Sequence, residues 1–394
     1  MYTIKTKKTM LFCLLIVAFK IFWIPTVVQK VLKFVIVLMV GTCFLGGIQK
    51  AKLFNCVNLY PLCIFAASLY GYFYGYIGMA KVIDALVYSL IIFLLFFLIT
   101  EITLEDSIDC VYRVLQIYFW LSLVSVILVK LDVIHTEYYF AGNKFRTMYY
   151  SLLYICMYKV RNVKIKKIKR KTGTVIVDKH IIIFWGLLFS LLLISRIVDC
   201  STGTVIVIMV AIFEFIPDKW LSILKQPKTV VLTLVCSALF LLVLNKILDM
   251  PFIRTIIVSL LHEDLGLTGR FAVYDKIRSI ILRSPLFGYG YGNSAVYMAT
   301  NKTIANAQSS IFQMIVDYGV LGTGSFILIN YVCLRKEGRV LSSYQEITPL
   351  YSYIYAIQVA AIIEIVFDYW YVVVIYLIYS YNRQDKTKNQ TAPL

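Results

Sequence analysis

Uninterrupted apolar runs of about 20 residues recur along this chain from residue 10 to residue 381. A helix of that length crosses a hydrocarbon layer about 30 Å thick. The composition agrees, since 60% of the residues are hydrophobic and the mean hydropathy is +0.81. Soluble domains are only about half apolar. The sequence therefore predicts an all-α integral membrane protein, and residues 1–394 form a single polytopic domain because no soluble domain fits between the runs.

The apolar runs predict about twelve transmembrane helices, with ends uncertain by a few residues. Their expected ranges are 10–28, 31–48, 55–76, 82–100, 111–131, 146–160, 181–198, 201–217, 230–249, 309–333, 348–365 and 367–381.

Lysine and arginine gather in short segments between the apolar runs, although the net charge is +18. That distribution sets membrane orientation, because cytoplasmic loops carry an excess of basic residues. The strongest case is segment 159–180, which we expect to be a basic cytoplasmic loop beside anionic membrane lipid. It has no aromatic interleaving and no DNA-binding motif, so we expect no nucleic-acid partner.

Counting helices from a cytoplasmic N-terminus puts the basic segments on one side and predicts a multi-pass cell-membrane protein with both termini cytoplasmic. Segment 101–109 is an acidic exception, but Asp and Glu have little orienting effect. Two long segments then fall outside the cell, 132–145 and about 250–308. Segment 250–308 is aromatic and sparingly charged, so we expect a large extracytoplasmic loop of short helices at the membrane surface.

Within that loop the stretch TGRFAVYDKIRSIILRSPLFGYGYG (268–292) sets arginines among aromatic residues. Arg270, Tyr274 and Arg278 share one face of a helix, and Arg283 lies off that face near the turn. Guanidinium groups bind phosphate oxygens in pairs, which suits a lipid-linked pyrophosphate. The alternative is an interfacial helix whose arginines meet lipid headgroups.

The turn that follows is rich in glycine, and Gly288 and Gly290 permit a tight backbone with exposed N–H groups. Such groups add positive potential for an anion. Arg196 lies at the outer end of the seventh predicted helix. It either joins the loop arginines around one anionic ligand or extends to the membrane interface.

Asp317 lies about two turns inside an apolar helix, where a carboxylate indicates a functional site. The alternative is a structural partner for one of the arginines. Glu364 and Asp368, near an outer turn, could supply further acidic groups or be plain loop carboxylates. The nine cysteines contain no CxxC pair and the three histidines are far apart, so we expect neither disulfides nor a metal site.

These segments resemble the signature of the O-antigen polymerase and ligase superfamily. The resemblance consists of TGR, about a dozen residues with an aromatic, SPLFGYGYGN, and a polar cluster leading into IFQMIVDYGVLG. ISRIVDCSTG (194–203) and FAGNKFRTMYY (140–150) are similar to two further motifs of that family. The match covers about 60 residues strongly and about 140 more loosely, and it is most like a Wzy-type capsular or exopolysaccharide repeat-unit polymerase.

The resemblance implies a metal-independent membrane glycosyltransferase without a cofactor. It would transfer a growing glycan from undecaprenyl pyrophosphate onto an incoming lipid-linked repeat unit at the outer membrane face. Its partners would include a flippase and a chain-length regulator of the same pathway. Arg196, Arg270 and Arg278 would stabilise the departing pyrophosphate. Substrate-binding residues would be Arg283, Tyr274, Asp275, Gly288, Gly290 and Gln308.

One position departs from the family pattern. Many relatives, notably the ligases, carry a histidine where this chain has Gln308 or a neighbour, and glutamine cannot act as a general base. Asp317, Asp275, His262 and Glu263 stay open as the base. The alternative functions are an O-antigen-type ligase, a lipid-linked oligosaccharide flippase or polysaccharide transporter, and a structural membrane subunit. A transporter would show inverted repeats and midplane charges, which the sequence lacks.

Overall fold

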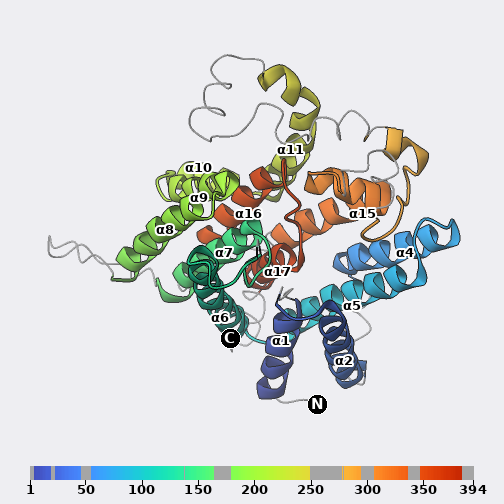
Figure 1. Ribbon diagram of the computed structural model, residues 1–394, viewed down its shortest axis with the longest axis horizontal. Helices are drawn as coiled ribbons and strands as arrows, with labels where there is room; N and C mark the ends of the chain where they lie inside the picture. Colours follow the sequence, from blue (N-terminus) through green and yellow to red (C-terminus); the bar gives the residue numbers. More distant parts are fainter. Residues whose placement is uncertain are drawn as a thin grey trace, which may run out of the picture.

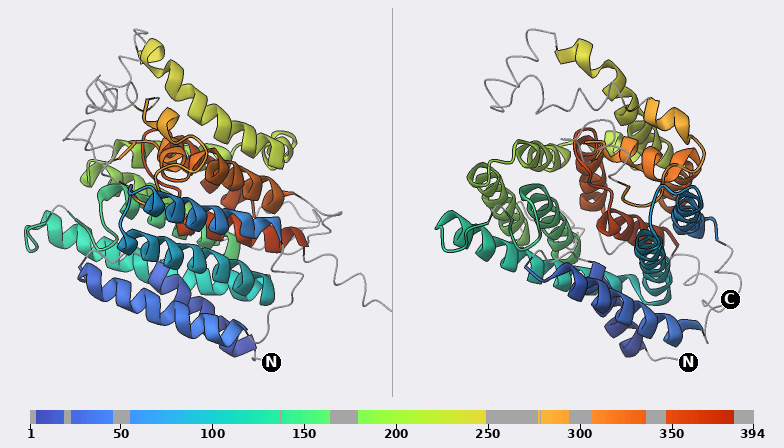
Figure 2. Two further views of the ribbon diagram at one scale, coloured as in Figure 1. Left: turned by 90° about the vertical axis from the view of Figure 1, so that its right-hand side faces the viewer. Right: turned by 45° about the vertical axis from the view of Figure 1, so that its right-hand side comes forward.

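The computed structural model describes residues 4–18, 23–45, 55–136, 138–163, 179–248, 277, 279–293, 306–335 and 347–383. Over this part of the chain the fold is all-helical, and no residue lies in a β-strand. The helices stack roughly parallel to one another, as Figures 1 and 2 show. The expected all-α class is therefore confirmed.

Each of the twelve predicted ranges overlaps one long helix, and a short 3₁₀ turn η1 (Cys56–Asn58) and the short α10 (Asp218–Leu224) add to them. The long helices are α1 (Ile4–Ala18), α2 (Thr26–Leu45), α4 (Leu59–Phe73), α5 (Met79–Glu101), α6 (Leu104–Lys130), α7 (Lys144–Asn162), α8 (Lys179–Ile197), α9 (Ser201–Phe213), α11 (Pro227–Leu248), α15 (Ser310–Leu334), α16 (Thr348–Ala360) and α17 (Tyr369–Arg383).

Six helical segments of the described chain are long and apolar enough to cross a membrane: Thr26–Cys43, Cys56–Phe73, Met79–Glu101, Leu104–Lys130, Lys179–Ile197 and Ser310–Leu334. The expectation of twelve spans is met only in part. Helices α9 and α16 have 13 residues each. At about 1.5 Å per residue they reach only about 20 Å, short of the hydrocarbon thickness. Most of the expected loop 250–308 lies outside the described residues.

The acidic segment 101–109 is neutralised by basic residues from three other parts of the chain. Glu101 contacts Lys7 at 3.0 Å, and Asp106 contacts Lys8 at 2.5 Å. Asp109 accepts from Arg113 at 2.7 Å and Arg161 at 2.6 Å. The starts of α1 and α6 and the ends of α5 and α7 therefore share one end of the bundle, which we name the basic end.

Helix α17 runs in the same direction as α5. Tyr88 of α5 packs against Tyr369 at the start of α17, and Phe96 packs against Tyr379 near its end. Because α5 ends at the basic end, α17 does too. The starts of α7 and α17 consequently lie at the opposite end of the bundle, which we name the site end.

Helix α17 occupies the middle of the bundle (Figure 1). Its apolar side chains are buried on every side, from Trp370 at 0% exposure to Tyr379 at 3%. A helix that is apolar all round requires neighbours all round. That position lets α17 hold the residue before its first turn, Asp368, inside the bundle.

Helix α15 is broken at Gly319, whose φ of 64° and ψ of −168° are not helical. Carbonyls 316 and 317, one turn before the break, accept instead from the N–H groups of Tyr289 and Gly290, both at 2.8 Å. The N–H groups of residues 320 and 321 donate to the carbonyls of Pro285 and Leu286, at 2.9 and 3.2 Å. The segment 285–290 thus supplies partners for four backbone groups around the break, as a buried backbone requires.

Candidate functional site

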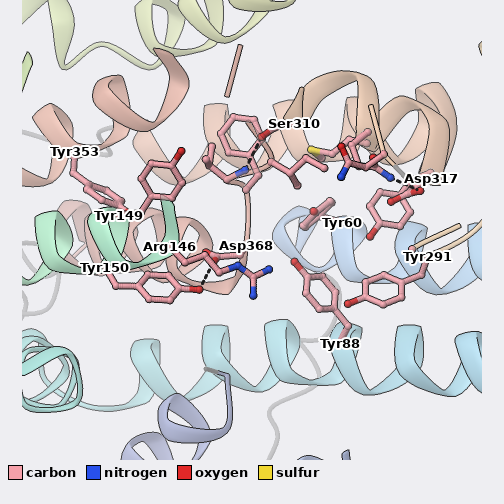
Figure 3. A pocket seen from close by; sticks show the side chains of 18 residues that line it. Tyr60, Tyr88, Arg146, Tyr149, Tyr150, Tyr291, Ser310, Asp317, Tyr353 and Asp368 are labelled. Carbon is pink, nitrogen blue, oxygen red and sulfur yellow. Dashed lines mark hydrogen bonds between the residues drawn. The ribbon is translucent and has the colours of Figure 1, made fainter. Parts of the chain in front are cut away.

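A cavity of about 310 Å³ lies among α4, α5, α7, α15, α16 and the segment just before α17. We name it the central cavity (Figure 3). It gathers one arginine, two carboxylates and seven tyrosines from segments far apart in the sequence. The residues that line it are Tyr60, Tyr88, Arg146, Tyr149, Tyr150, Tyr291, Gly292, Asn306, Ser310, Gln313, Met314, Asp317, Tyr318, Tyr353, Ile365, Val366, Phe367 and Asp368.

Arg146 lies in the first turn of α7 and supplies the positive charge of the central cavity. Asn143 caps this helix, because its side chain accepts from the N–H of Arg146 at 3.1 Å. The guanidinium points into the space that Tyr60, Tyr88 and Tyr291 enclose (Figure 3). Among the described residues, no acceptor is hydrogen-bonded to it and no carboxylate lies at ion-pair distance. Its donors are therefore available to an anion.

Asp368 lies between α16 and α17, on the Tyr150 side of Arg146. One carboxylate oxygen accepts from the hydroxyl of Tyr150 at 2.7 Å, and the other accepts from the N–H of Trp370 at 2.9 Å. Burial raises the pKa of this carboxyl, while the Tyr150 hydrogen bond and the charge of Arg146 oppose that rise. The carboxyl is thus held in a fixed position beside the cation without a direct ion pair.

Asp317, the predicted membrane carboxylate, also lines the central cavity. It accepts from Gln313 Nε2 at 2.9 Å and from the backbone N–H groups of Gly292 and Asn293. These donors are neutral, so Asp317 is not held as the ion-pair partner of an arginine. Its carboxylate fixes the end of the glycine-rich turn against α15.

Three helices begin at the central cavity. Arg146 is in the first turn of α7, Ser310 opens α15, and Asp368 precedes α17. Helix N-termini carry a partial positive charge. The site end of the bundle therefore adds positive potential to that of Arg146, which favours an anionic ligand.

A second hollow of about 410 Å³ adjoins the central cavity. We name it the polar hollow. It shares Arg146, Tyr149, Asn306 and Ile365 with the central cavity and adds Gln308 and Glu364. Gln308, a predicted substrate-binding residue, thus lies beside Arg146 rather than beside Asp317. Its backbone has a φ of 52°, and its N–H donates to the side chain of Asn306 at 2.9 Å.

The expectation that Gly288 and Gly290 present exposed N–H groups to a phosphate is wrong. The N–H of Gly288 donates to Ser284 O at 3.1 Å, and that of Gly290 donates to Asp317 O at 2.8 Å. Both residues have positive φ, and a Cβ on Gly288 would lie 2.5 Å from a carbonyl oxygen of α15. These glycines serve close backbone packing against α15.

The predicted cations divide into two groups. Arg196 and Arg283 are exposed, and neither lines the central cavity. Arg196 lies in the last turn of α8, near the site end of the bundle. There the backbone carbonyl of Asp199 accepts from Lys144 Nζ at 2.5 Å. The remaining predicted site residues, Arg270, Tyr274, Asp275 and Arg278, lie outside the described residues.

Arg146 is the residue that sequence reasoning missed. The segment FAGNKFRTMYY was recognised as family-like, but its arginine was not selected. A signal was present, because Asn143 is a preferred N-cap residue and puts Arg146 in the first turn of a helix after an outer loop. Within the described residues, no three His, Cys, Asp or Glu side chains are grouped to hold a metal ion.

A scan against protein-family models finds no match to this chain, and a search of curated proteins finds no relative.

Proposed function

We propose that this protein is a polysaccharide polymerase that moves a growing glycan from a polyprenyl diphosphate onto an incoming lipid-linked repeat unit. The observation that carries the proposal is the central cavity, where an available guanidinium, two carboxylates and seven tyrosines meet at three helix starts. The positive-inside rule supports a cytoplasmic basic end, which puts the central cavity toward the outer face. The resemblance of segment 268–322 to O-antigen polymerases agrees with this assignment.

Arg146 stabilises the leaving diphosphate in this proposal. Negative charge builds up on the leaving group as its bond to the sugar breaks, and a preorganised cation in a low-dielectric cavity is the strongest available stabiliser. The helix starts of α15 and α17 add to it. Arg270 and Arg278 remain predicted contributors from the adjoining segment.

The tyrosines bind the sugar in the same scheme. A tyrosine presents a flat apolar face and one hydroxyl, which matches the apolar faces and hydroxyl groups of a pyranose ring. Tyr60, Tyr88 and Tyr291 lie on one side of the guanidinium of Arg146 (Figure 3), so a sugar packed on them would hold its anomeric carbon near that charge.

Asp368 is the general base of the proposed reaction. The acceptor hydroxyl oxygen attacks the anomeric carbon of the donor, the bond from that carbon to the diphosphate oxygen breaks, and the hydroxyl proton passes to Asp368. Burial raises the pKa of Asp368, which makes it a better proton acceptor than an exposed aspartate. Asp368 is preferred to Asp317 because its carboxyl lies beside the guanidinium of Arg146, where the leaving group is held (Figure 3).

The test is deletion of the gene followed by analysis of glycans on the lipid carrier. Single repeat units at the outer face of the cell membrane would support polymerisation. Units trapped on the cytoplasmic side would instead indicate a flippase, and finished polymer left on the lipid would indicate a ligase.

The site assignment is tested by complementing that deletion with Arg146→Ala, Arg146→Lys and a control, Arg113→Ala. Loss of the guanidinium that lines the central cavity should lower polymer yield by about 10² to 10³, the scale seen for one oxyanion donor. Lysine should restore part of it. Arg113 contacts Asp109 at the basic end, so its loss should leave the yield unchanged. Full-length polymer from Arg146→Ala at normal expression would refute the assignment.

A further inference from the structure

A third hollow, about 490 Å³ in volume, lies between α2, α5 and the start of α17. We name it the apolar groove. Its walls are mostly aliphatic and aromatic, and polar side chains stand among them. The residues that line it are Thr26, Gln29, Lys30, Val31, Lys33, Phe34, Ala80, Ile83, Asp84, Val87, Tyr291 and Tyr369.

Helix α2, which forms one wall, lies at the edge of the bundle (Figure 1). Only 11% of the residues in its span Thr26–Cys43 are buried, and Val27 and Val31 are 70% and 58% exposed. Apolar side chains that face outward on a membrane helix face lipid. The apolar groove thus borders the region where lipid chains reside.

Charged side chains distinguish the apolar groove from a purely apolar groove between membrane helices. Lys30 contacts Asp84 at 2.7 Å across it, and Lys33 lies 5.9 Å from the ring centre of Tyr369. Two lysines and one aspartate leave an excess of one positive charge. Lysine binds phosphate as a point charge.

The apolar groove and the central cavity lie on either side of a wall of tyrosines. Tyr291 lines both hollows. Tyr88 of the central cavity packs on Tyr291 at 5.2 Å and on Tyr369 at 4.4 Å between ring centres. A molecule with an apolar tail and a polar head could therefore lie along the groove with its head at the cavity.

We infer that the apolar groove binds the polyprenyl diphosphate part of one lipid-linked substrate, an inference that rests on the proposed function for its substrate class. The methyl-branched isoprenoid units pack along Val31, Phe34 and Val87. This substrate is the incoming repeat unit, because Arg146 holds the leaving diphosphate of the donor. Its own diphosphate lies at Lys33, and the attached sugar lies at the tyrosine wall that also lines the central cavity.

Photolabelling of the purified full-length protein in nanodiscs tests the inference, with a benzophenone-bearing farnesyl diphosphate as the probe. Labelled peptides should map to α2 and α5. Excess undecaprenyl diphosphate should lower labelling at least fivefold, whereas phosphatidylglycerol should not. Labelling confined to other helices, or equal competition by phosphatidylglycerol, would overturn the inference.

Two variants sharpen the test, with a neighbouring residue as control. Val31→Trp fills the apolar groove and Lys33→Ala removes its charge, so each should lower labelling at least fivefold. Leu32 is 46% exposed and does not line the groove, so Leu32→Trp should label as the unaltered chain does. If Val31→Trp does not fold, Lys33→Ala and Lys33→Arg carry the test alone. Unchanged labelling in Lys33→Ala would refute the diphosphate position.

The groove inference and the proposed polymerase function can be refuted independently of each other. If deletion of the gene leaves polymer intact but the probe still labels α2, the proposed polymerase is wrong and the apolar groove stands as a polyprenyl diphosphate site. If polymer is lost on deletion but Val31→Trp and Lys33→Ala label normally, the polymerase stands and the groove inference is wrong.

Discussion

Gly319 offers the sharpest test of how the site is held together, through the substitution Gly319→Ala. Its φ of 64° and ψ of −168° fall in a region that only glycine adopts readily, and occupying it costs another residue about 1–3 kcal/mol. An added Cβ would also lie 2.1 Å from Leu286 O and 2.6 Å from Phe287 N. Since both atoms belong to backbone, the 285–290 segment must move away.

That movement breaks the bonds from residues 320 and 321 to Pro285 and Leu286. Each buried hydrogen bond contributes about 1 kcal/mol, and more when its partners stay unsatisfied. With the backbone strain included, the expected loss in the free energy of unfolding is about 3–6 kcal/mol.

The assay is denaturation by sodium dodecyl sulfate in mixed micelles, with Gly324→Ala as the control. Gly324 lies on the same helix, and a Cβ there would meet no atom within 4 Å. Alanine at a helical position is neutral or stabilising by up to about 1 kcal/mol. Unfolding free energies within about 1 kcal/mol of each other for the two variants would refute the account of the helix break.

Three further results are expected. The polymerisation rate should fall as pH decreases through the raised pKa of Asp368, because the proton-accepting carboxylate is lost. This fall should occur above the ordinary aspartate pKa of about 3.9. The Asp317→Asn variant should keep the same acid dependence of the rate, and the Asp368→Asn variant should lose it. Lys159→Ala should destabilise the protein by about 3–5 kcal/mol, because it removes the ion-pair partner of the mostly buried Glu214. Adding Glu214→Gln should restore part of that loss in the same micelle assay. Polymer formation by the purified protein should continue in excess EDTA, and its loss would contradict the metal-independent mechanism.

The helices could be predicted from the sequence because an apolar run is a local pattern that does not depend on which helices pack together. All twelve expected ranges overlap a helix, and the acidic segment 101–109 proves compatible with the basic end once Lys7, Lys8 and Arg161 are seen to pair with it. Helix lengths were harder to predict. Tyrosine-rich α17 is apolar enough to be buried, yet at 15 residues it is shorter than a full span.

The site was predicted only in part. Asp317 lines the central cavity and Gln308 lines the polar hollow, so the structure puts both beside hollows, and their substrate-facing roles stay predictions. The proximity of Arg146 and Asp368 could not be predicted, because they are 222 residues apart. They come together only through the packing of α7 against the start of α17. The glycine turn was misread because spacing alone does not show whether an N–H group already has a carbonyl partner.

The broken helix has a mechanical consequence. Four backbone hydrogen bonds join residues 285–290 to α15, two to carbonyls before Gly319 and two from N–H groups after it. The two halves of α15 are therefore braced against bending by a second segment of backbone, and the half that bears Asp317 keeps a fixed angle to the other half.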